Sequence, residues 1–460
     1  MVSAAEQLAR NINLSTFGKA KELQARIWFT LGALIVYRLG THIPIPGVNP
    51  DQYAQAYGSA SQGILGLWNT FSGGAVQRMA IFALNVMPYI SASIIIQIMS
   101  TAIPALERLK KEGEVGRKQL NQYTRYLTVV LAIAQAFGVA VALSAVDPTT
   151  GQSMAVDPSL YFMFSTIITL VGGTIFLMWL GEQITARGVG NGISLVIFAG
   201  IVAEFPRWVF NTFGQLRENQ MSIISLLAIV GMSIAMIVFI VFMERSQRRL
   251  LIQYPKRQQG NRMVGGESSF LPLKVNAAGV IPPIFASSLL LLPATMAAFS
   301  NAQGGQAEGW WGETLAFIQA YLGHGQPGFI ILYSVLIIFF CFFYTSIVFN
   351  PEETAENLRK YGGFIPGYRP GKRTAEHLDY VLTRLTVIGS LYITFVCVLP
   401  EILRNPQLFG SLSSQVYIGG TSILIVVSVT MDTVAQIQSH LIGHQYEGMI
   451  KRSRLGGKKK

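Results

Sequence analysis

The chain has 460 residues, of which 51% are hydrophobic and only 13% are charged, and it carries a formal net charge of +12. Soluble globular proteins carry about 25% charged residues, so this composition excludes a soluble enzyme and indicates a polytopic membrane protein. The two cysteines, Cys341 and Cys397, lie within apolar segments. We therefore expect free, packed thiols and no disulfide framework.

Residues 1–24 are polar and lack the apolar core of a signal peptide, so we expect an uncleaved cytoplasmic N-terminal segment. Behind it, apolar windows predict ten transmembrane helices. The windows fall at about 25–43, 78–103, 123–144, 161–181, 190–206, 221–243, 274–297, 328–349, 381–402 and 416–442. The predicted fold class is an all-α integral membrane protein.

The stretch from 62 to 99 is the most informative part of the chain. An apolar stub at about 62–74, GILGLWNTFSGG, is too short to cross a bilayer, which needs about 20 residues. Ser72, Gly73 and Gly74 join it to a full apolar span that contains Pro88. Such broken helices occur where the backbone lines a cavity or is buried in protein. The stretch therefore predicts a pore or pathway, and Pro88 and Pro282–Pro283 predict kinks in their spans.

The charge of the connecting loops alternates along the chain. Lys and Arg gather between spans two and three, six and seven, and eight and nine, and in the tail at 443–460, whereas 145–159 and 300–326 have none. The positive-inside rule places the basic loops and both termini in the cytoplasm. Ten spans also divide into an N-terminal half at 25–206 and a C-terminal half at 207–442. These halves would run in opposite directions, a topology that places a pathway between them.

Three kinds of site are poorly supported by the sequence. Transporters keep charged groups at membrane depth, but Asp432 is the clearest such group here. Enzymes need a catalytic motif, and HExxH, GxSxG and Walker sequences are missing. The histidines do not cluster at metal spacing, and the glycines of ARGVGNG predict a tight turn at a helix start. We therefore expect no catalytic, cofactor-binding or metal site.

Two basic loops are too long to be simple connectors. In the loop at 244–273, the alternation LLIQY predicts a hairpin that turns at KRQQGNR. In the loop at 350–380, Pro351 predicts the start of a helix that Gly362 and Gly363 end, followed by the basic tip FIPGYRPGKR. Basic loops at a membrane contact anionic lipids. Their length and structure also point to a large polyanionic partner such as ribosomal RNA.

Several long sequence blocks resemble one known family in the right order. They are RLGTHIPIPG, FSGGAVQRMAIFALNVMPYISASIIIQ, GRKQLNQYTRY, LMWLGEQITARGVGNGISLVIFAGIVA, LPLKVNAAGVIPPIFASS, the stretch from FFYTSIVFNPEETAENLRKYGG to AEHLDYVLTRLT, and GGTSILIVVSVTMDTVAQIQSHL. Over about 25–445 the chain closely resembles the SecY/Sec61-alpha family of protein-conducting channels. The resemblance implies ten helices in two pseudo-symmetric five-helix halves around a central pore, with the stub at 62–74 as a plug helix.

The resemblance also implies roles for individual residues. The pore ring is expected at Val86, Ile90, Ile197, Ile284 and Ile425. The lateral gate is expected to include Ser91, Gln97, Gln135 and Asn276. Docking of a ribosome or SecA motor is expected at Lys256, Arg257, Arg262, Arg369, Lys372 and Arg373, and the plug is expected to present Leu65, Leu67, Trp68 and Phe71. Val86 stands where the family often has isoleucine, and Asn261 where relatives can have a second arginine.

The implied function is the passage of unfolded preproteins across the bacterial inner membrane and the lateral release of transmembrane segments into lipid. The implied partners are SecE, SecG, the SecA ATPase, the ribosome, preprotein signal sequences, anionic lipids, and SecDF and a YidC-type insertase. A passive channel has no nucleotide site, so energy would come from SecA, the ribosome or the proton-motive force. A secondary transporter and an intramembrane enzyme are the alternatives.

Overall fold

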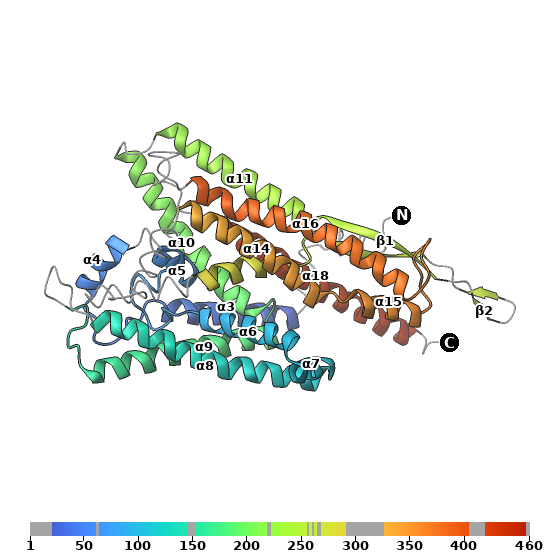
Figure 1. Cartoon of the computed structure of the whole chain (residues 1–460), viewed down its shortest axis with the longest axis horizontal. Helices are drawn as coiled ribbons and strands as arrows, with labels where there is room; N and C mark the ends of the chain where they lie inside the picture. The colour runs from blue at the N-terminus through green and yellow to red at the C-terminus, as the bar shows by residue number, and fades with distance from the viewer. Residues whose placement is uncertain are drawn as a thin grey trace. The chain divides into compact units, whose positions relative to one another are not determined.

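The computed structural model is mainly helical (Figure 1). It describes residues 21–60, 64–144, 153–218, 222–254, 257–259, 262–264, 268–290, 326–403 and 419–456. The chain divides into two compact units. Unit 1 comprises Met1–Asn211, Leu292–Ala320 and Val429–Lys460, and unit 2 comprises Thr212–Leu291 and Tyr321–Ser428.

Unit 1 is built around the two long helices α8 and α9. The α8 helix packs against α6 and α9, and α9 packs against α3 (Figure 1). The elements of this unit are α3 (Lys21–Gly40), α4 (Pro50–Ala60), α5 (Ile64–Ser72), α6 (Met87–Ala102), α7 (Pro104–Lys111), α8 (Glu114–Ser144), α9 (Leu160–Arg187), most of α10 (Gly192–Arg217) and the later part of α18 (Gly420–Gly456).

Unit 2 is centred on α16, which packs against α14, α15 and α11. Its elements are α11 (Ile223–Arg245), β1 (Gln247–Gln253), β2 (Arg257–Gln259), β3 (Arg262–Val264), β4 (Ser268–Lys274), α14 (Pro327–Val348), α15 (Pro351–Lys360), α16 (Lys372–Leu403) and the first part of α18. A short apolar helix also spans Ile281–Leu290. Cys341 and Cys397 are buried free thiols in this unit, as predicted.

Seven helices in the described part of the chain are long and apolar enough to cross a membrane. An eighth span results if α6 and α7, which meet at 99°, are counted together. The chain is therefore a multi-pass membrane protein. The remaining two expected spans coincide with α3 and with Ile281–Leu290, neither of which passes the same test, so the count of ten stays a prediction.

The second expected span differs from its prediction. The window at 78–103 is helical only from Met87, because Met79 and Asn85 adopt left-handed backbone conformations (φ 45° and 51°) that interrupt a helix. Pro88 lies in the first turn of α6, where its missing N–H is not needed. Pro282 likewise lies in the first turn of Ile281–Leu290. The prediction of kinks at these prolines was wrong, because they begin helices.

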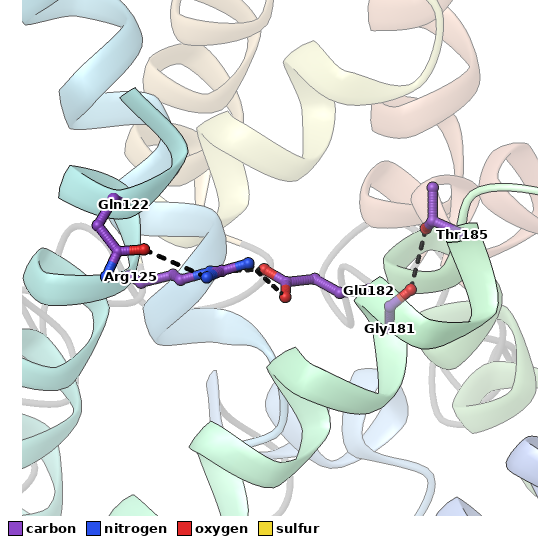
Figure 2. A network of polar contacts seen from close by, with 5 residues as sticks. All are labelled: Gln122, Arg125, Gly181, Glu182 and Thr185. Carbon is purple, nitrogen blue, oxygen red and sulfur yellow. Dashed lines mark hydrogen bonds and ion pairs between the residues drawn. The ribbon is translucent and has the colours of Figure 1, made fainter. Parts of the chain in front are cut away.

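The glycine-rich segment ARGVGNG forms the predicted tight turn at a helix start. Its backbone amides donate to side chains from three helices, Val189 to Thr30 (3.1 Å), Gly190 to Gln436 (2.9 Å) and Gly192 to Thr185 (2.8 Å). Figure 2 shows Thr185 beside the carbonyl of Gly181, to which its hydroxyl donates at 2.9 Å. The turn therefore fixes how α10 follows α9.

An ion pair joins α8 to α9 close to this turn (Figure 2). The Arg125 guanidinium donates to both carboxylate oxygens of Glu182, at 2.9 and 2.7 Å, and to Gln122 at 3.2 Å. A bidentate pair of this kind fixes orientation more strongly than a single contact. It therefore sets the register between the two helices.

Two adjacent glycines on α9 give a matched test of its packing. A Cβ at Gly173 would collide with the carbonyl oxygen of Ile81, whereas a Cβ at Gly172 would meet nothing within 4 Å. Gly173→Ala should lower the free energy of unfolding by about 1–3 kcal/mol, the usual range for overpacking, and Gly172→Ala should not lower it. Thermal unfolding in detergent measures both, and equal midpoints for the two variants would contradict the packing described.

Candidate functional site

The α5 helix is a nine-residue apolar helix that a turn follows. Its side chains Trp68 and Phe71 are buried. Leu65 and Leu67 also lie on α5, but their side chains are outside the described part of the structure. The predicted stub is therefore a separate short helix, far below the length that spans a bilayer.

Side chains from neighbouring segments hold the C-terminal end of α5. We call the four donors the α5 anchor. They are Asn85 to the Phe71 carbonyl (2.6 Å), Tyr37 to the Ser72 carbonyl (3.2 Å), and Arg38 (2.5 Å) and Arg78 (3.1 Å) to the Gly73 carbonyl. The last carbonyls of a helix have no partner within it. The anchor therefore supplies partners that water would otherwise have to provide.

A tight turn follows α5 directly. Gly73 and Gly74 both have positive φ, at 64° and 82°. A Cβ at Gly73 would lie 2.9 Å from the Cα of Gly200 in α10, and one at Gly74 would collide with Glu204. Glycine suits both the backbone conformation and the close approach, which explains the FSGG sequence.

The irregular segment from 75 to 86 has backbone partners outside itself. The Ile45 amide donates to the Met79 carbonyl and the Ile81 amide to the Ile43 carbonyl, both at 2.9 Å. Tyr53 donates to the Val76 carbonyl at 2.6 Å. Non-helical backbone in a membrane protein needs such internal partners, so the residues that follow α3 and Tyr53 of α4 position this irregular stretch.

Two tyrosines of α4 lie close to this segment. Burial first, and the Glu204 carboxylate second, raise the pKa of Tyr57 to about 12. Burial also raises the pKa of Tyr53. Both hydroxyls therefore keep their protons at neutral pH, and Tyr53 stays a hydrogen-bond donor.

The residues expected in the pore ring are distributed over both units. Val86 and Ile90, at the start of α6, and Ile197, in α10, are buried side chains of unit 1. In unit 2, Ile425 is buried in α18 and Ile284 is half-buried in the Ile281–Leu290 helix. Val86 is the N-cap residue directly before α6, the other four lie on helices, and their joint arrangement stays a prediction.

Three of the polar residues expected at the lateral gate lie on helices, and the fourth, Asn276, lies between β4 and the Ile281–Leu290 helix. Ser91 is buried in α6, and Gln97, on the same helix, donates to Ser93 at 3.1 Å. Gln135 is half-buried on α8, which packs against α6. In unit 2, the Asn276 amide donates to Glu244 at 2.6 Å, and Tyr392 donates to the same carboxylate oxygen at 3.4 Å. Glu244 was not singled out from the sequence.

The two long loops form one module in unit 2. Antiparallel pairing of β1 with β4 and of β2 with β3 confirms the hairpin, and β2 reaches past α15 and α16 in Figure 1. Asn350 caps α15, which starts at Pro351 as predicted. Gln253 and Phe364 exchange backbone hydrogen bonds at 2.9 and 3.0 Å, which join the two loops. A shared apolar core lies beneath them and contains Leu250, Leu273, Ala355, Ile365 and Leu378.

The expected docking residues are exposed where the structure describes their side chains. Arg369 is exposed between Gly367 and Gly371, both of which have positive φ, and its carbonyl accepts from Thr374 at 2.8 Å. Lys372 and Arg373 are exposed at the start of α16. The side chains of Arg257 and Arg262, on β2 and β3, and the whole of Lys256 lie outside the described part.

Comparison with known proteins decides the family. The SecY family model matches residues 80–434. The chain belongs to the SecY family. It is 52% identical over 434 residues to the protein translocase subunit SecY of Rickettsia conorii, which covers 94% of this chain and 97% of that protein. The SecY subunit of Escherichia coli is 49% identical over 443 residues, covering 96% of this chain and 97% of that protein.

Solved structures show the same fold at lower identity. A protein-conducting channel aligns over 90% of this chain and 92% of its own, with a TM-score of 0.61 and 18% identity. Sec61 in a canine ribosome–channel complex from the endoplasmic reticulum aligns over the same shares, with a TM-score of 0.60 and 18% identity. The fold of this chain is therefore similar to that of these channel structures.

Sequence reasoning missed the α5 anchor. Tyr37 and Arg38 stand at the end of the first apolar window, where such residues are ordinary. Asn85 precedes Val86 within an apolar stretch, and an isolated Asn there is a possible signal of left-handed backbone. Glu401, which is buried near the end of α16, was also overlooked.

The shared core of the loop module predicts a local stability effect. Ile365→Ala removes a buried side chain (5% exposed), so it should destabilise the module by about 2–5 kcal/mol. Limited proteolysis of the two loops should then be faster. Tyr361→Ala, at a side chain that is 78% exposed, is the matched control and should cleave like the parent. Equal cleavage of all three proteins would contradict a common core.

Proposed function

We propose that the chain is the pore-forming subunit of the general secretory translocon. It passes unfolded preproteins across the inner membrane and releases transmembrane segments laterally into lipid. The observation that carries this proposal is the near full-length match, at 52% identity, to a relative named protein translocase subunit SecY. The structural feature that fits this proposal is the short α5 helix, whose C-terminal end is held by side chains of other segments of unit 1.

The proposed pathway runs between an N-terminal half at 25–206 and a C-terminal half at 207–442. Val86, Ile90, Ile197, Ile284 and Ile425 form its apolar constriction. An apolar constriction excludes water and ions by dewetting. It also lacks hydrogen-bonding side chains, so it retains no particular polypeptide sequence. These properties suit a passage for many different substrates.

In this proposal α5 is the plug, and the lateral gate contains Ser91, Gln97, Gln135 and Asn276. Hydrogen bonds between helices in membranes are worth about 0.6 kcal/mol on average. A gate held by a few such bonds can open when a hydrophobic signal segment arrives. The Asn276–Glu244 bond then ties the gate residue of unit 2 to the base of the hairpin.

The proposed docking surface for the ribosome or the SecA motor is formed by the basic tips of the loop module, and not by α15. Its residues are Lys256, Arg257, Arg262, Arg369, Lys372 and Arg373. Its support is the exposed basic tip at Arg369, Lys372 and Arg373, together with the ribosome-bound Sec61 chain among the structural neighbours. Arginine and lysine provide the main contacts to phosphate groups. We further propose SecE and SecG as companion subunits, cooperation with SecDF and a YidC-type insertase, and energy from SecA, the ribosome or the proton-motive force.

The proposed location is the bacterial inner membrane with both termini in the cytoplasm. The alternation of basic and neutral loops supports this orientation. It places the loop module and the tail at 443–460 on the side of the ribosome and of anionic lipid headgroups.

Charge reversal at Arg369 tests the docking surface. Arg369→Glu should abolish SecA- or ribosome-dependent translocation into vesicles, because it replaces a phosphate-binding cation with an anion, while the protein stays folded in the membrane. Arg359→Glu, at an exposed arginine of α15 that we do not place in the docking surface, is the control. Normal translocation by the Arg369 variant would overturn the assignment.

Polar substitution in the apolar constriction tests the seal. Ile90→Ser combined with Ile197→Gly should raise the ion conductance of resting channels in planar bilayers, because water can enter a less apolar pore. Ile98→Ser, at a side chain of α6 that is 38% exposed, should leave the conductance low. A double variant as tight as the parent would contradict the ring.

A further inference from the structure

The Tyr37 hydroxyl belongs to the α5 anchor, and the proposed function gives it no role. We propose that Tyr37 and Asn85 are positioning residues that hold α5 in the sealed state, so that opening the pore requires breaking their two hydrogen bonds. This inference rests on the proposed function, because it treats α5 as the plug.

The two pairs of anchor donors act on different parts of the chain. Tyr37 and Asn85 bind the carbonyls of Ser72 and Phe71, which belong to α5 itself. Arg38 and Arg78 bind the carbonyl of Gly73, which lies beyond the helix. If α5 moves as a rigid helix, the first two bonds must break, whereas the arginine contacts to Gly73 can remain. The arginines then keep the end of the segment in place while the helix leaves.

Tyr37 holds α5 by a single contact that can break when the helix moves. Its side chain is fully buried, and its ring stacks on Phe82 with centroids 6.2 Å apart. The ring therefore keeps its position independently of α5, and only the hydroxyl reaches the Ser72 carbonyl, at 3.2 Å. One hydrogen bond at this distance is weak enough to break during a functional cycle.

Asn85 connects α5 to the start of the proposed pore wall. Its amide nitrogen donates to the Phe71 carbonyl at 2.6 Å, and its backbone, at φ 51°, makes the turn into Val86 and α6. Asparagine is among the few residues other than glycine that visit this conformation readily. Asn85 therefore both holds the end of α5 and makes the turn that leads through Val86 into α6, the helix of Ile90.

The test compares two tyrosines with the same bond chemistry. Tyr37→Phe removes a hydroxyl that donates to a carbonyl of α5 and keeps the stack on Phe82. Tyr53→Phe removes a hydroxyl that donates to the Val76 carbonyl, outside α5, and keeps its stack on Tyr57. A typical hydrogen bond corresponds to about a fivefold change in an equilibrium constant. In planar bilayers, Tyr37→Phe should raise the open fraction of resting channels by about fivefold, and Tyr53→Phe should leave it unchanged.

Thermal unfolding separates the positioning role from a purely structural one. A structural role for both hydroxyls predicts similar small losses in midpoint and no change in open fraction, and that result would overturn the proposal. Asn85→Gly tolerates the backbone turn but removes the amide, so it should also raise the open fraction. If Asn85→Gly and Tyr37→Phe both stay closed, the proposal is wrong.

The ring variant of Ile90 and Ile197 distinguishes this failure from failure of the proposed function. If the ring variant leaks but the Tyr37→Phe and Asn85→Gly channels stay closed, the pore assignment stands. Only the proposed role of Tyr37 and Asn85 in holding α5 is then rejected. Tight channels in all of these variants would instead count against the pore itself.

Discussion

Backbone that is neither helical nor paired needs a hydrogen-bond partner wherever water is excluded, and the segment from 73 to 86 shows how the protein meets this requirement. Its backbone groups pair with Arg38 of α3, with the residues that follow α3 and with Tyr53 of α4. Its Asn85 in turn donates to the Phe71 carbonyl of α5. Gly173 leaves room on α9 for the Ile81 carbonyl. The position of α5, the start of α6 and the packing of α9 all depend on this one segment. A substitution at any of these partners should therefore shift both α5, the proposed plug, and the start of α6, the proposed pore wall.

The loop module follows a different principle, because it is held by an apolar core of its own. Leu250 comes from β1 in the first loop, whereas Ile365 and Leu378 come from the second loop and the start of α16. The Gln253–Phe364 bridge links the two loops at their backbones. Such a core holds the base of the exposed basic tip in one geometry. A surface that must accept a large polyanionic partner gains from this arrangement, since less flexibility is lost on binding.

Much of the fold could be predicted from apolar windows and turn residues. The break after Ser72, the turn at ARGVGNG, the hairpin and the start of α15 at Pro351 each follow from local rules for glycine, proline and strand alternation. The late start of α6 could not, because it depends on left-handed Met79 and Asn85, conformations that tertiary contacts impose. The α5 anchor was missed for the same reason, since the bond from Tyr37 to Ser72 joins residues 35 positions apart. The roles of the ring, gate and docking residues came from family resemblance, because an apolar side chain in a pore and one in a helix contact look alike in sequence.

The central claim is that polypeptide passes through the apolar constriction. The most direct measurement is site-specific photocrosslinking of a stalled preprotein from probes placed at Ile90, Ile197, Ile284 and Ile98 in the assembled translocon. If polypeptide takes this path, strong adducts form from Ile90, Ile197 and Ile284, and Ile98 gives only background labelling. Equal labelling from all four positions, or labelling from Ile98 alone, would contradict it.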